Sequence, residues 1–226
     1  MKNLSGMSKF IQASLVIGSV LSFIGCDRQR VAQPEGETTA KKHGCFECHG
    51  SSGISQHPNF PNLASQKTQY IINQLETFRR SGIPNSGVNP IRKRYNLMMN
   101  AKAAELSDTE ITLLARYFSQ RPCDFFNSPI SLPPPEKVRV CSQCHGENGI
   151  SQQQDIPSLA GQKQLYLENQ LWAFRATTKF NAPGEQRGGR YHKLMTVQAA
   201  ELSDKDITEL TSYYSSLNCR NSRGVN

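Results

Sequence analysis

An internal repeat constrains this chain more than any other feature of its sequence. When the 226-residue sequence is shifted by 96 positions against itself, residues 45–49 fall on residues 141–145 and residues 103–108 fall on residues 199–204, with no gap between them. The match extends as far as Cys123, which falls on Cys219. Self-similarity at one fixed offset indicates a duplicated unit. The chain is therefore expected to fold as two similar domains in tandem.

The composition between the repeats predicts the domain boundaries. Residues 127–137 include three consecutive prolines at 133–135, and proline lacks a backbone donor and favours extended backbone. This segment is predicted to be a stiff linker between a first domain at residues 41–126 and a second at residues 138–226. Residues 26–40 are polar and poor in apolar side chains, which indicates a tether ahead of the first domain.

The first 25 residues have the pattern of an export signal. Lys2 and Lys9 precede an apolar stretch at residues 10–25, which is short for a membrane span of about 20 apolar residues. An exported chain enters an oxidising compartment. The stretch ends Phe-Ile-Gly-Cys, which resembles a bacterial lipoprotein cleavage box and predicts lipidation of Cys26; an ordinary signal with a coincidental cysteine is the alternative. An aspartate directly after the lipidated cysteine, here Asp27, is associated with retention of a lipoprotein at the inner membrane. The protein is therefore predicted to lie in the bacterial periplasm, anchored to the inner membrane.

Apolar spacing predicts that both domains are helical, which makes the fold class all-α. Ile111, Leu114 and Phe118 recur at intervals of three and four residues after Ser107, and Ser107 with Glu110 forms a capping-box pattern. The second copy repeats this spacing, and a further helix is predicted in each domain ahead of it. The stretches 82–97 and 178–194 are rich in glycine, proline and arginine and are predicted to be loops, with no strand pattern.

Each domain carries one C-x-x-C-H motif, formed by Cys45, Cys48 and His49 in the first copy. The second copy has Cys141, Cys144 and His145. This spacing is typical of covalent attachment of a c-type haem, in which the two thiols bond the haem and the histidine ligates iron. A thioredoxin-like pair would need a strand–helix context, and a zinc site would need more ligands. The sequence therefore predicts two haem c groups.

The repeat also selects the second axial ligand of each iron. Methionine opposite histidine is typical of electron-transfer haems. In the second domain only Met195 is available, and its repeat mate is Met99 rather than Met98. We therefore predict His49 with Met99 and His145 with Met195.

The other histidines are weaker candidates for iron ligands. His43 and His57 have no histidine at the equivalent position of the second domain, and His192 matches Asn96. They are predicted to be surface residues. His192 is close enough to Met195 in the sequence to be a competing ligand.

Two further pairs of equivalent residues leave alternatives open. Cys123 and Cys219 follow the last helix of each domain, and a disulfide requires their Cα atoms to approach within about 7 Å. Arg94 and Arg190 precede the methionines in tandem with tyrosines. They either bind the carboxylates of the haem, which arginine suits, or face solvent in a basic loop.

Taken together, these motifs resemble the dihaem cytochromes c of the cytochrome c4 type. The resemblance is carried in the second copy by residues 141–146 (C-S-Q-C-H-G), 157–162 (P-S-L-A-G-Q), Met195 and residues 202–207 (L-S-D-K-D-I). The first copy departs in having Ser65 at the position of that glycine and Glu110 at that of the second aspartate. The resemblance implies two class I cytochrome domains packed around a pseudo-twofold axis. It also implies a periplasmic electron carrier that serves a terminal oxidase, a reductase or a quinol-oxidising complex.

The function predicted from the sequence is electron transfer rather than catalysis. One alternative is the electron-accepting cytochrome subunit of a dehydrogenase complex, and a second is a dihaem peroxidase, which would need an open iron position. The formal charge of +8 comes from scattered lysines and arginines. Because no nucleic-acid-binding motif accompanies them, nucleic acid is not expected as a partner.

Overall fold

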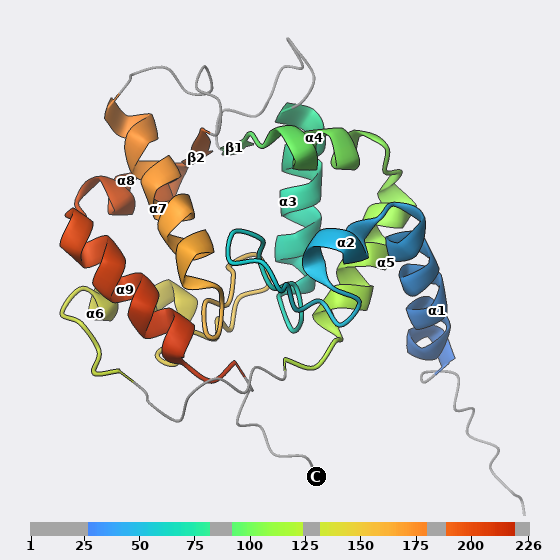
Figure 1. The fold of residues 1–226 in the computed structure, drawn as a ribbon, viewed down its shortest axis with the longest axis horizontal. Coiled ribbons are helices and arrows are strands. Elements are labelled where there is room, and N and C mark those ends of the chain that lie inside the picture. The colour runs from blue at the N-terminus through green and yellow to red at the C-terminus, as the bar shows by residue number, and fades with distance from the viewer. Residues whose placement is uncertain (1–26, 82–91, 124–131, 180–188, 220–226) are drawn as a thin grey trace, which may run out of the picture.

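The computed structural model describes residues 27–81, 92–123, 132–179 and 189–219. The predicted signal peptide, Cys26, residues 127–131 of the linker and residues 220–226 lie outside these ranges. Within them the chain forms two helical halves placed side by side (Figure 1). The all-α fold class is confirmed. None of the helices in the described ranges is both long enough and apolar enough to cross a membrane.

The two halves have the same order of elements. The first half contains α1 (Asp27–Lys42), α2 (Cys45–His49), α3 (Thr68–Ser81), β1 (Arg92–Arg94), α4 (Leu97–Ala104) and α5 (Asp108–Ser119). The second contains α6 (Val138–His145), α7 (Gln164–Lys179), β2 (Arg190–His192), α8 (Lys193–Ala200) and α9 (Asp204–Ser216). Only α1 has no counterpart among the described residues of the second half.

Each half has its own apolar core, centred on its last helix. Ile111, Leu114 and Phe118 of α5 are all buried and pack with Ile71 of α3. In the second half Ile207, Leu210 and Tyr214 of α9 are equally buried. Because the predicted apolar stripe is the face that is buried in both copies, the helices predicted from the spacing are confirmed.

The first half begins earlier than the sequence predicted. Residues 26–40 were expected to be a tether, but Asp27–Lys42 is a helix whose second half packs on α5. Ala40 is fully buried, and a Cβ on Gly36 would lie 2.7 Å from the Tyr117 Cβ and 2.8 Å from the Leu113 carbonyl oxygen. The tether prediction missed this helix because its contact with α5 uses small residues rather than an apolar stripe.

The loop prediction also differs from the structure. Each loop contains a three-residue strand, and β1 pairs antiparallel with β2 across the two halves, with Arg94 opposite Arg190. Short helices α4 and α8 follow directly. Strands of three residues carry too little pattern to be recognised, and their pairing depends on the approach of the two halves. By contrast, residues 132–137 of the predicted linker contain no helix, as expected.

Equivalent residues of the two halves meet along their interface. The Gln162 side chain accepts a hydrogen bond from the Asn62 N–H (2.8 Å), and the Gln66 side chain accepts one from the Ser158 N–H (2.9 Å). Both glutamines also donate to the carbonyl of the same residue. Cys123 and Cys219 form a disulfide, with Cα atoms 6.0 Å apart. This reciprocity is that of a pseudo-twofold axis.

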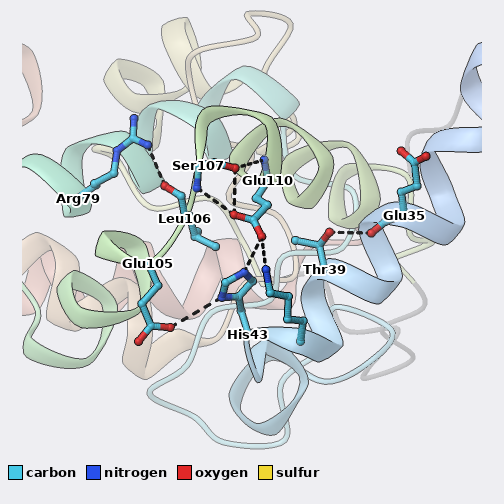
Figure 2. Close-up of polar contacts among 9 residues, drawn as sticks. Glu35, Thr39, His43, Arg79, Glu105, Leu106, Ser107 and Glu110 are labelled. Atoms are coloured by element: carbon cyan, nitrogen blue, oxygen red, sulfur yellow. Dashed lines mark hydrogen bonds and ion pairs between the residues drawn. The ribbon is translucent and has the colours of Figure 1, made fainter.

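The N-terminal cap of α5 also holds the end of α1 (Figure 2). Ser107 and Glu110 form the predicted capping box. The Glu110 carboxylate additionally binds the His43 ring at 3.0 Å and the Lys42 ammonium at 2.8 Å. His43 was predicted to be a surface residue, but it is buried, because it packs beneath this carboxylate. The hydrogen bond to Glu110 gives His43 a structural role, so its burial does not require it to be an iron ligand.

Substitution of Gly36 tests the contact between α1 and α5. Gly36→Val should lower the free energy of unfolding by about 1 to 3 kcal/mol, because the added side chain overlaps Tyr117. Denaturant unfolding of the haem-loaded protein would measure this. Glu35→Val places the same side chain on an exposed neighbouring position and is the control. Equal stability of the two variants would show that α1 does not pack closely on α5.

The contacts of Glu110 predict a stability that depends on pH. Hydrogen bonds from His43, then from Lys42 and Ser107, hold the pKa of Glu110 well below its ordinary value of 4.5. The carboxylate therefore stabilises the fold above that value, and this contribution is lost as the pH falls below it. Glu110→Gln should lower the melting temperature at pH 7, and the gap to the unsubstituted protein should narrow below about pH 4.

Asp206 provides a matched control for that measurement. It occupies the same capping-box position in α9, where its carboxylate accepts hydrogen bonds from Ser203. In the described part of the second half, no hydrogen bonds like those from His43 and Lys42 to Glu110 are added to this carboxylate. Asp206→Asn should therefore lower the melting temperature less than Glu110→Gln does at pH 7. An equal effect would mean that the His43 and Lys42 contacts contribute no stability.

Candidate haem sites

The two C-x-x-C-H motifs each form the end of a short helix. Cys45 and Cys48 lie on α2, three residues apart and hence about one helical turn from each other, and Cys141 and Cys144 are placed alike on α6. All four thiols are free of disulfides. Burial raises the pKa of the Cys45 thiol to about 11. The structure thus presents two free thiols in the same short helix as each histidine.

The histidine of each motif is buried and held by a backbone carbonyl. His49 Nδ1 lies 2.9 Å from the Pro61 carbonyl oxygen, and His145 Nδ1 lies 2.8 Å from that of Pro157. The carbonyl requires a proton on Nδ1, which leaves Nε2 as the nitrogen for a metal. Burial lowers the pKa of both histidines. Each ring is therefore kept neutral, in the tautomer that ligates through Nε2.

A tight turn places that carbonyl under the ring. Gly50 follows His49 with a φ of 74°, and a Cβ there would collide with the Ile54 carbonyl oxygen. The buried Ser55 hydroxyl then donates to the Cys48 carbonyl at 2.7 Å, and the Ser55 N–H donates to the Asn62 side chain. The second half keeps the glycine and the serine, with Ser151 donating to Cys144 at 3.0 Å. The local fold is therefore the same at both motifs.

Met99 and Met195 take equivalent positions in the first turns of α4 and α8. The Met99 N–H donates to the side chain of Asn96, which caps α4, and the Met195 N–H donates to the ring of His192, which caps α8. Both methionines are half-buried, whereas Met98 is 54% exposed. The burial agrees with the choice of Met99 over Met98. His192, which the sequence left as a competing ligand, serves as a helix cap through Nδ1.

The arginines ahead of the methionines do not face solvent. Arg94 and Arg190 are each only 9% exposed and lie at the domain interface, which excludes the solvent-facing basic loop. Their hydrogen-bond partners include Gln74 and Gln170, which the sequence analysis did not single out. The two glutamines occupy equivalent positions of the repeat, which is the sequence signal for them. Neither lies near a C-x-x-C-H motif in the sequence, so the sequence did not connect them with the arginines.

The family model for cytochrome c matches residues 34–121 and 138–218. The chain belongs to the cytochrome c family. Cytochrome c4 of Stutzerimonas stutzeri is 32% identical over 185 residues, which cover 76% of this chain and 84% of that protein. The thiosulfate dehydrogenase electron acceptor of Stutzerimonas stutzeri strain A1501 is 28% identical, covering 84% of this chain and 86% of that one.

A solved structure agrees with this assignment. The crystal structure of reduced recombinant cytochrome c4 from Pseudomonas stutzeri superposes with a TM-score of 0.62 at 28% sequence identity. The match covers 82% of this chain and 98% of that one. The chain is therefore a dihaem cytochrome c of the cytochrome c4 type, an electron-transfer protein with two c-type haems.

The side chains present fit two haems. Each half offers a pair of free thiols next to a buried, neutral imidazole with Nε2 available. In the described ranges, no group of three or more histidine, cysteine or acidic side chains could hold a metal ion. When bound, each haem supplies an iron that accepts and releases one electron. The protein supplies the attachment points, the axial ligands and an apolar surrounding for them.

Proposed function

We propose that this cytochrome carries electrons through two haems of identical ligation. In the first half Cys45 and Cys48 form the thioether bonds, and His49 and Met99 are the axial ligands. In the second half the thioethers are formed by Cys141 and Cys144 and the axial ligands are His145 and Met195. The observation that carries this assignment is the repeated bond from the buried histidine Nδ1 to a proline carbonyl, which leaves Nε2 of each ring available to iron.

The methionines suit a carrier better than an enzyme. A thioether opposite histidine fills the sixth position of the iron and raises its reduction potential. The Asn96 and His192 caps fix the helices that carry Met99 and Met195. With both positions filled, neither iron offers a site for peroxide, so a dihaem peroxidase is the weaker interpretation.

Carbon monoxide tests the assignment, because it binds ferrous haem only where the sixth position is open. The reduced protein should contain two haems per chain and keep its absorption spectrum under the gas. Met99→Ala and Met195→Ala should each let one of the two haems bind it, whereas Met98→Ala, at the exposed neighbour, should not. Binding by one haem of the unsubstituted protein would contradict the carrier function for that half.

We further propose that the protein acts in the bacterial periplasm, anchored to the inner membrane through lipidated Cys26. The apolar signal, its lipobox-like end and the attachment chemistry of two haems c support this location. The Cys26→Ser variant should move from the membrane fraction to the soluble periplasmic fraction. If the unsubstituted protein is already soluble, the anchor does not exist.

The partners follow from the same function. A terminal oxidase, a reductase or a quinol-oxidising complex would exchange electrons with the two haems, and no nucleic acid is involved. A second candidate is the electron acceptor of a dehydrogenase, which is favoured by the similarity to the thiosulfate dehydrogenase electron acceptor of Stutzerimonas stutzeri. Purification under mild conditions distinguishes these two functions. A dedicated subunit of a dehydrogenase would co-purify with its enzyme in a fixed ratio, whereas a general electron carrier would purify alone.

A further inference from the structure

The two helices that carry the proposed methionine ligands begin differently. In the first half, Asn96 is the N-cap of α4, and its side-chain oxygen accepts a hydrogen bond from the Met99 N–H at 3.0 Å. In the second half, His192 occupies the equivalent position ahead of α8, and its Nδ1 accepts from the Met195 N–H at 3.4 Å. Asparagine is among the residues preferred at a helix N-cap, and histidine is not. The cap of α8 is therefore the weaker of the two.

The residue that follows each methionine extends this difference. Asn100 and Thr196 are equivalent in the repeat and equally buried, each with 5% exposure. Each side chain accepts a hydrogen bond from the backbone N–H of its cap residue, at 2.7 Å for Asn100 and at 3.1 Å for Thr196. An asparagine amide has two further hydrogens to donate, whereas a threonine hydroxyl has one. Asn100 is thus able to join α4 to another element while it holds the cap.

Asn100 uses its amide donor to attach α4 to the end of α3. Its Nδ2 donates to the Phe78 carbonyl oxygen at 2.5 Å. Phe78 is one of the last four residues of α3, whose carbonyls have no donor within the helix. The equivalent Phe174 is not among the last four residues of α7, which ends at Lys179, so its carbonyl accepts within the helix. Among the described residues, Thr196 donates no hydrogen bond to α7.

The strands ahead of the two helices do not show this difference. The Arg94 N–H of β1 donates to the Ser81 hydroxyl of α3 at 3.3 Å, and the Arg190 carbonyl of β2 accepts from the Thr177 hydroxyl of α7 at 2.9 Å. Both halves therefore bond the strand to the long helix before it, and the asymmetry begins at the cap. In the described part of the chain, α8 lacks the hydrogen-bonded attachment that Asn100 gives to α4.

The firmness of these helices matters most for oxidised iron. Methionine opposite histidine raises the reduction potential, which means that the thioether binds reduced iron more strongly than oxidised iron. An outside ligand therefore competes with methionine chiefly in the oxidised state. Groups that hold a metal ligand in place typically change the strength of its binding by about 10- to 100-fold. Unequal support for α4 and α8 is thus expected to give methionine bonds of unequal strength.

We propose that Met195 is the more easily displaced of the two methionine ligands, because α8 is held less firmly than α4. The responsible positioning residues are Asn96 and Asn100 in the first half and His192 and Thr196 in the second. The proposal rests on the axial ligands proposed above. It assigns ligand exchange in the oxidised protein to the second iron, with both sixth positions filled when no competing ligand is present.

Titration of the oxidised, haem-loaded protein with imidazole at one fixed pH tests the proposal, because imidazole competes with methionine for oxidised iron. The absorption spectrum should change in two steps, and the second haem should bind imidazole at a concentration about tenfold lower than the first. Met99→Ala and Met195→Ala assign the steps, since each removes the competing thioether from one known iron.

Exchange of the cap residues should exchange the behaviour of the two haems. Asn96→His should lower the imidazole concentration required at the first haem, and His192→Asn should raise it at the second. Asn100→Thr removes the donor to Phe78. It should lower the concentration required at the first haem by about tenfold and leave the second haem unchanged.

Thr77→Val is the matched control. It removes another buried hydrogen bond of α3, from the Thr77 hydroxyl to the Asn73 carbonyl, without a change at either cap. Both imidazole steps should therefore stay at the concentrations of the unsubstituted protein. If Asn100→Thr folds poorly, the two cap exchanges decide the question without it.

The outcomes separate this proposal from the proposed haem ligation itself. Equal imidazole binding by the two haems of the unsubstituted protein, or tighter binding by the first, would overturn the proposal. Cap exchanges that leave both steps unchanged would overturn the role of the positioning residues. If neither Met99→Ala nor Met195→Ala makes an iron more accessible to imidazole, the proposed axial ligands are wrong instead.

Discussion

The pairing of two buried guanidinium groups is the constraint on which the arrangement of the halves depends. Arg94 stands opposite Arg190 in the β1–β2 ladder, and each donates across the interface to a tyrosine of the other half. A separate set of reciprocal bonds between Gln66 and Gln162 and the disulfide join the same halves elsewhere. Residues at equivalent repeat positions take part from both halves at each of these places, so the contacts share one pseudo-twofold relation.

Within each half, the chemistry depends on a shorter chain of contacts. The motif helix ends at the histidine, a glycine with positive φ reverses the chain, and a proline carbonyl twelve residues later returns to the imidazole Nδ1. These contacts are local in sequence, which explains why they are nearly identical in the two copies. They fix the tautomer of each imidazole and leave its Nε2 available to a metal.

The first half differs from the second where the sequence repeat is broken. His43 and Lys42 have no equivalents in the second half, and they attach the end of α1 to the capping box of α5. In the sequence, this contact is marked only by His43, which has no repeat mate, and by the small residue Gly36. Isolated residues of these types are also common in exposed segments. Sequence reasoning therefore assigned His43 to the surface and residues 26–40 to a tether. The burial depends on α5, which is far away in the sequence.

The sequence by itself determined the duplication, the helical fold class and the two C-x-x-C-H motifs, and it predicts Met99 rather than Met98 as an iron ligand. These features follow from spacing, and spacing is a property of the chain alone. Only the tertiary structure decided that Arg94 and Arg190 are buried, that β1 pairs with β2 and that Cys123 lies within bonding distance of Cys219. Each of these depends on how two units that the repeat makes alike approach each other, and an internal repeat specifies what is duplicated without specifying which faces meet.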